Sequence, residues 1–139
     1  MNPASTHTRT PAQRLGDAAE SLAADHLVGL GWTILGRKVR VGRKEIDVIG
    51  LDPGPPTNLV LVEVRWRARR DFGLGEETFD RRKQAHLRAA LGQLVETGAL
   101  PDGRRLPIMP VRIDLVVVEP GRRMGGPPRI RHHRDALAH

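Results

Sequence analysis

The chain has 139 residues, and its 23 Lys and Arg outnumber its 16 Asp and Glu, which gives a formal net charge of +7. This length predicts one domain with a single core, and the absence of cysteine excludes a disulfide framework and any thiolate metal site. No apolar run approaches the roughly 18 residues needed to cross a bilayer, and the N-terminus lacks a hydrophobic signal segment. We therefore expect a cytoplasmic protein without a membrane partner, whose positive charge favours nucleic acid as its ligand.

The N-terminal part of the chain predicts a lead-in followed by a helix. Residues 1–13 are polar and contain two prolines, so we expect a disordered lead-in before a single domain at 14–139. Apolar residues at helical spacing predict a helix over 14–30, with Gly31 in the C′ position. At about 100° per residue, Glu20 falls on the shoulder of the apolar stripe of this helix. An ordinary glutamate on the helix flank is the equal alternative for Glu20.

The remainder of the chain predicts a sheet and a second helix. Apolar runs predict strands at 32–35 with a continuation at 38–41, then at 45–50, 59–67 and 111–119, and an edge strand at 129–133. A helix is predicted between the third and fourth of these, from Thr78 as its N-cap to residue 97. This order predicts an α/β three-layer sandwich, with a mixed central sheet flanked by helices.

Three acidic residues border or interrupt the apolar segments, namely Glu20, Asp47 and Glu63. Because side chains alternate along a strand, Glu63 and Arg65 share one face, and Asp47 points away from its apolar neighbours on both sides. A carboxylate inside an apolar strand is costly unless something binds it. A divalent metal held by Asp47 and Glu63 explains the pattern. A salt-bridged sheet with its acids on a solvated face is the equal alternative.

Convergence of these acids favours a metal-dependent reaction on phosphate. If the first helix packs on the two strands, the three carboxylates meet, and a hard cation such as Mg²⁺ or Mn²⁺ relieves their repulsion. Such an ion clamps a phosphodiester oxygen and activates water, and Arg65 stabilises the charge that develops at phosphorus.

Basic residues near these acids are candidates for contacts with phosphate. Arg81, Arg82 and Lys83 crowd the start of the second helix, where the macrodipole disfavours cations unless an anion such as phosphate lies among them. Solvated bases paired with nearby acids are the equal alternative. Lys83 lies one turn before the apolar Leu87, so its side chain is expected to point toward the core side. Arg67 belongs to a basic run at 65–70 that is suited to a phosphate backbone. His132 lies in a basic tail and is expected to be solvated.

Several segments form a recognisable set, namely residues 16–27 (GDAAESLAADHL), 45–50 (EIDVIG), 61–67 (LVEVRWR), Lys83, 112–116 (RIDLV) and 135–137. Together they resemble the YraN-like family of small bacterial proteins. The resemblance implies a restriction-endonuclease-like fold and a nuclease signature in which Asp47 and Glu63 are the metal ligands. Glu20 matches the helix acid that joins the metal site in related junction-resolving nucleases. These relatives are dimers, which by analogy leaves a homodimer as an expectation.

Two residues depart from the pattern that the resemblance implies. Arg65 occupies the position of the signature lysine, and arginine cannot usefully lose its proton, whereas a buried lysine can. If the chemistry needs a neutral amine, Arg65 is a defect, and if it needs a fixed positive charge, Arg65 suffices. Lys44 stands in place of the usual glycine and adds a further contact for phosphate.

The leading hypothesis is an Mg²⁺- or Mn²⁺-dependent DNA endonuclease that acts on structured or branched DNA. Its expected metal ligands are Glu20, Asp47 and Glu63, its further catalytic residue is Arg65, and its expected contacts to nucleic acid are Lys44, Arg67, Arg81, Arg82 and Lys83. The alternative is a catalytically inactive nucleic-acid-binding module with the same fold, which Arg65 favours. A third hypothesis is a basic interaction protein that docks on another protein or on a membrane surface.

Overall fold

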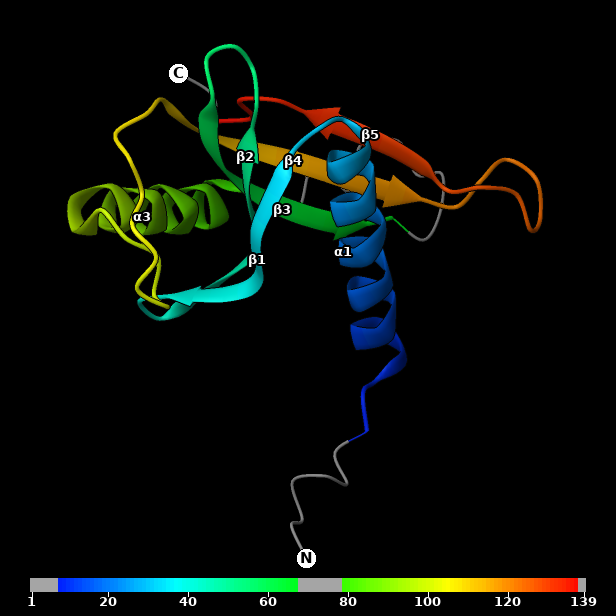
Figure 1. The fold of residues 1–139 in the computed structure, drawn as a ribbon. Coiled ribbons are helices and arrows are strands. Elements are labelled where there is room, and N and C mark those ends of the chain that lie inside the picture. The colour runs from blue at the N-terminus through cyan, green and yellow to red at the C-terminus, as the bar shows by residue number, and fades with distance from the viewer. Residues whose placement is uncertain (1–7, 68–78, 138–139) are drawn as a thin grey trace, which may run out of the picture.

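The computed structural model describes residues 8–67 and 79–137, in which two helices flank one five-stranded sheet (Figure 1). In chain order the elements are α1 (Pro11–Gly29), β1 (Thr33–Val41), β2 (Lys44–Asp52), β3 (Asn58–Trp66), α3 (Arg81–Thr97), β4 (Val111–Glu119) and β5 (Arg129–His133). The strands lie in the order β1-β2-β3-β4-β5, where β3 and β4 are parallel and the other neighbours antiparallel. The predicted α/β class with a mixed central sheet is confirmed.

The two helices cover opposite faces of the sheet, which produces three layers (Figure 1). The cluster beneath α1 contains Ala23, Leu27 and Val62, while the cluster beneath α3 contains Leu61 and Leu94. Because consecutive strand residues point to opposite faces, β3 contributes core side chains to both layers, as a central strand does. The sheet therefore separates the chain into an α1 side and an α3 side.

Helix α1 begins at Pro11, three residues before the predicted start, because its N-terminus is capped there. The Thr10 hydroxyl accepts the Gln13 N–H at 3.1 Å, and the Gln13 side chain accepts the Thr10 N–H at 2.8 Å. This reciprocal pair forms a capping box, and Pro11 occupies a first-turn position that needs no N–H donor. The helix ends as predicted, since Gly31 adopts a φ of 93° just after it.

Helix α3 begins at Arg81, so the predicted start at Thr78 is wrong, and Thr78 itself lies outside the described residues. Asp80 is the N-cap, and its carboxylate accepts the Lys83 N–H at 2.9 Å. A negative N-cap partly compensates for the cations in the first turn of the helix. Neither helix in the described part of the chain is long and apolar enough to span a membrane.

Candidate functional site

Asp47 occupies the place where β2 and β3 stop pairing. The last paired residues of this ladder are Val48 and Val62, and beyond them the Val64 N–H donates to Asp47 Oδ2 at 2.8 Å. A side-chain carboxylate thus accepts a strand N–H that a backbone carbonyl would accept in a continuous ladder. The half-buried Asp47 is held between the two strands at a fixed position.

The neighbours of Asp47 contradict the expected alternation. Alternation predicts that Ile46 and Val48 share one face of the sheet and that Asp47 points to the other. This prediction is wrong, because Ile46 packs beneath α3 and Val48 packs beneath α1, on opposite faces. β1 is irregular at the same place: opposite Asp47, Lys38 adopts a φ of 50° and no residue of β1 pairs with Asp47. A positive φ at a non-glycine residue is a local strain of the kind found at functional sites.

Glu63 is the buried member of the site, with an exposed fraction of 2%. Its Oε2 lies 2.8 Å from an Arg65 guanidinium nitrogen and 3.5 Å from Lys83 Nζ. Lys83 therefore points from α3 toward the sheet, as its position in the helix predicts. The other oxygen, Glu63 Oε1, is buried and has no hydrogen-bond partner among the residues that the structure describes. A buried carboxylate oxygen without a donor is a place where a cation is favourable.

The titration of Asp47 is perturbed by burial and by its neighbour Glu63. Burial raises the pKa of Asp47 to about 7, and the negative charge of Glu63 contributes to this rise. The Val64 N–H and the Lys83 ammonium act in the opposite direction, because both favour the ionised form. At neutral pH, Asp47 is therefore close to half protonated. A bound cation would replace that proton.

Glu20 reaches the same region from α1, but a lysine holds it. Its Oε2 lies 2.9 Å from Lys38 Nζ, which also contacts Asp17 at 2.8 Å. Burial raises the pKa of Glu20 above its usual value, the charge of Asp47 adds to the rise, and the hydrogen bond from Lys38 opposes it. Glu20 is thus near enough to Asp47 to sense its charge. Lys38 is a site residue that sequence reasoning missed, since no local pattern predicts its positive φ.

The arrangement fits a hard cation on two carboxylates. In the described parts of the chain, no three His, Asp or Glu side chains form a group that could hold a metal ion. The structure brings Asp47 and Glu63 together and leaves Glu20 beside Lys38, outside a common set of three ligands. Mg²⁺ is often held by one or two carboxylates and keeps several waters. The unpartnered Oε1 of Glu63 and the raised pKa of Asp47 fit such an ion.

The predicted basic residues divide into a surface group and one buried residue. Lys44, Arg81 and Arg82 are exposed, and the charges of Lys44, Arg82 and Lys83 all act on His86 in α3, lowering its pKa after the larger effect of burial. These cations therefore lie near one another, beside the carboxylate pair.

Arg67 differs from this group. It is buried, and its guanidinium lies 3.3 Å from Glu119 Oε2 in β4, so we correct its assignment as a surface contact for nucleic acid. An acid on the neighbouring strand, 52 residues away in sequence, accounts for the burial of this arginine.

A second polar cluster surrounds Asp114, which is completely buried. Its carboxylate accepts Arg112 Nε at 2.9 Å and the Asp135 N–H at 2.9 Å, and it lies 2.8 Å from His132 Nε2. Burial alone raises the pKa of Asp114, but the hydrogen bonds from His132 and Arg112 outweigh it and hold the pKa below its usual value. The prediction of a solvated His132 is wrong, because β5 pairs with β4 and places the ring 5.7 Å from Trp32. This cluster has its donors and acceptors matched, which is typical of a structural network.

Comparisons with known proteins identify relatives. The profile of the uncharacterised protein family UPF0102 matches residues 19–118. A UPF0102 protein of Clavibacter michiganensis subsp. michiganensis is 39% identical over 91% of this chain and 98% of its own length. A UPF0102 protein of Dehalococcoides mccartyi is 36% identical over 75% of this chain and 78% of its own length. Among solved structures, Pyrococcus furiosus SfsA in complex with Ca²⁺ aligns with a TM-score of 0.37 and 16% identity, over 88% of this chain and 63% of that chain. That structural similarity is too weak to carry an argument.

Proposed function

The chain belongs to the uncharacterised protein family UPF0102, as its YraN-like segments predict, and from this premise we propose that it is a nucleic-acid-binding protein with nuclease activity. The proposed reaction is hydrolysis of a phosphodiester bond in structured or branched DNA, with Mg²⁺ or Mn²⁺ as the cofactor. The observation that supports this most strongly is the pair of Asp47 and Glu63. Burial and mutual repulsion raise the pKa of Asp47 to about 7, and perturbed pKa values cluster at functional sites.

Each residue around the pair has a proposed role. Asp47 and Glu63 would hold the cation, which when bound polarises a phosphoryl oxygen and acidifies a water molecule. Arg65 supplies a fixed positive charge beside Glu63 for the charge that develops at phosphorus. Lys83, whose amine also contacts Glu63, supplies a second positive charge beside that carboxylate to orient a phosphate. Glu20 orients Lys38 at the edge of the site.

The direct test is cleavage of branched and single-stranded DNA in the presence of Mg²⁺ or Mn²⁺. We expect Asp47→Asn and Glu63→Gln each to lower the rate more than roughly 100-fold, because even outer residues around a metal contribute 10- to 100-fold. Glu45→Gln is the matched control, since Glu45 lies on the same strand as Asp47 but is exposed. Undiminished cleavage by both site variants would refute the proposed centre.

A specific observation also favours the catalytically inactive module. Glu63 is 2.8 Å from Arg65 and Glu20 is 2.9 Å from Lys38, so the protein's own cations neutralise two of the three acids. On this alternative the same surface binds nucleic acid through Lys44, Arg81 and Arg82 without cleaving it. Binding without cleavage in either metal would select this alternative.

Both alternatives predict that the affinity for nucleic acid falls as the salt concentration rises. Arg82→Ala is expected to weaken DNA binding and to reduce the slope of log K against log salt concentration by about 0.9, the value for one lost phosphate contact on duplex DNA. Fluorescence anisotropy over a salt series measures this slope. Arg123→Ala, at an exposed base between β4 and β5, should leave it unchanged. Equal slopes for wild type and Arg82→Ala would contradict the assigned surface.

A further inference from the structure

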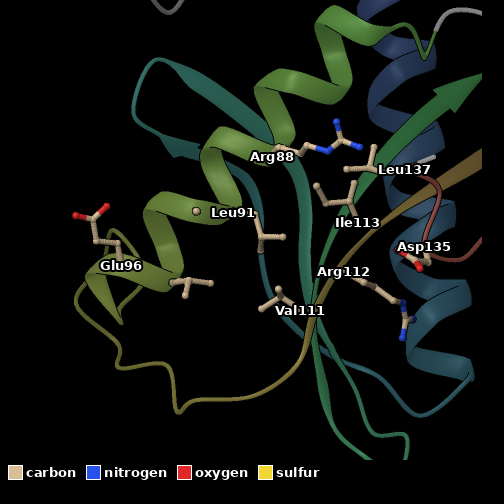
Figure 2. A pocket seen from close by; sticks show the side chains of 10 residues that line it. Arg88, Leu91, Glu96, Val111, Arg112, Ile113, Asp135 and Leu137 are labelled. Atoms are coloured by element: carbon tan, nitrogen blue, oxygen red, sulfur yellow. The ribbon is translucent and has the colours of Figure 1, made fainter. Parts of the chain in front are cut away.

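A pocket of about 490 Å³ opens between α3 and β4, and its lining includes none of the acids discussed above as metal ligands (Figure 2). Leu91 and Val95 of α3 line one side, and Val111 and Ile113 of β4 line the other. A smaller pocket of about 100 Å³ adjoins it, because Val95 and Val111 line both. The two hollows therefore form one apolar depression, which we call the α3–β4 depression.

Large apolar side chains are exposed around this depression. Val95 is 57% exposed, Val111 is 39% exposed, and Ile108, which lines the smaller pocket, is fully exposed. Single exposed apolar residues are common, but neighbouring ones around a pocket mark an interaction surface. A partner that covered these three side chains would remove them from water.

The outer side of α3 also carries a glycine in its interior. A Cβ at Gly92 would meet nothing within 4 Å, so the fold of the single chain gives no steric reason for glycine there. Glycine in a helix interior destabilises by roughly 0.5 to 1 kcal/mol relative to alanine. Close approach of another backbone is one physical reason for a glycine at such a position.

Two opposite charges of this helix lie at equal distances from Gly92. Arg88 lies four residues before it and Glu96 four residues after it, and both line the pocket. Figure 2 shows Arg88 and Glu96 at opposite ends of the stretch of α3 that borders the pocket. In one chain they are about 12 Å apart along the helix axis, too far for contact with each other. A two-fold axis that passes between the Gly92 residues of two copies, across the helix direction, would bring Arg88 of each copy toward Glu96 of the other.

We propose that the α3–β4 depression is a homodimer interface in which α3 crosses α3 of a second copy at Gly92. The interface is isologous, so each charge pair occurs twice and each copy covers the exposed Val95 and Ile108 of the other. The opposite charges of Arg88 and Glu96 at equal distances from Gly92 favour a second copy over an unrelated partner. An antiparallel second copy necessarily presents its Glu96 to Arg88 and its Arg88 to Glu96. This interface does not depend on the proposed nuclease function.

Sedimentation equilibrium of the full chain, without DNA or metal, tests the interface by charge reversal. The wild type is expected to dimerise, and Arg88→Glu and Glu96→Arg alone should each weaken association by roughly tenfold or more, because like charges then face each other twice. The double variant should associate like the wild type. An equimolar mixture of the two single variants should form a heterodimer, since each charge then meets its opposite.

A steric variant and a control complete the experiment. Gly92→Leu fills open space in the single chain, so it should retain helical circular dichroism while abolishing the dimer. Arg88 has contacts within its own chain, so Arg88→Glu also changes those contacts. Glu96→Arg tests the same charge pair without altering Arg88. Arg105→Glu, at an exposed base outside the depression, should leave association unchanged. A wild type that stays monomeric at high concentration, or a double variant no better than the single ones, would overturn the interface.

Discussion

Asp114→Ala is expected to lower the free energy of unfolding by roughly 3 to 5 kcal/mol, the range for removing one partner of a buried ion pair. Asp114 is completely buried and accepts from Arg112, His132 and the backbone of Asp135. Without this carboxylate, the half-buried Arg112 guanidinium keeps only Asp52, the Asp135 N–H loses its acceptor, and His132 of β5 loses its contact with β4. Urea denaturation at pH 7 measures the loss.

The matched control for this prediction is Asp102→Ala. Asp102 also pairs with an arginine two residues away, at 2.8 Å from Arg104, but both side chains are more than half exposed. Exposed pairs contribute little because water and salt screen them. We expect little measurable change in unfolding for this variant. Equal stability losses for Asp114→Ala and Asp102→Ala would contradict the structural role given to the buried network.

Asp47→Asn is expected to gain stability relative to the wild type as the pH rises from about 4 to about 7. In this window the unfolded chain ionises Asp47, whereas the folded protein, with a pKa of about 7, retains the proton. The wild type therefore loses stability as pH rises through this range, and asparagine has no proton to lose. The difference should reach the order of 3 kcal/mol and stay constant above the folded pKa. Urea denaturation in EDTA at several pH values measures it.

Added Mn²⁺ provides a second readout of the same position. At pH 8, where Asp47 is mostly ionised, Mn²⁺ should raise the stability of the wild type and leave Asp47→Asn unchanged, because the cation would bind only where both carboxylates are present. For the pH profile, the control is Asp17→Asn, since hydrogen bonds from Lys38 and Arg9 lower the pKa of Asp17 instead of raising it. Its stability contribution is lost only below about pH 4, so its difference from wild type should be flat between pH 5 and 8. A flat profile for Asp47→Asn as well would contradict the raised pKa.

Local periodicity was sufficient to predict most of the fold. The strands at 111–119 and 129–133 were predicted with the bounds they have, and the order of elements predicted the mixed sheet. The same periodicity placed Glu20 at the edge of the core and turned Lys83 toward the sheet. The bounds of a strand and the direction of a side chain on a helix depend on which face of that strand or helix is apolar. The spacing of apolar residues within the segment itself contains this information.

Only the tertiary structure decided which charges are buried and where the carboxylates lie. Arg67 and His132 both lie in basic stretches of sequence, which suggests that they are solvated. In the structure Arg67 pairs with Glu119 and His132 pairs with Asp114, and both acids belong to β4. Asp47 lies where β2 stops pairing with β3 and opposite the positive φ of Lys38 in β1, and neither irregularity follows from the alternation of side chains along a strand. The sequence by itself determined the α/β layers and the acids available for chemistry. The pairing of those acids and cations was decided by the sheet, because burial of a charge depends on a partner that strand pairing brings from a distant part of the chain.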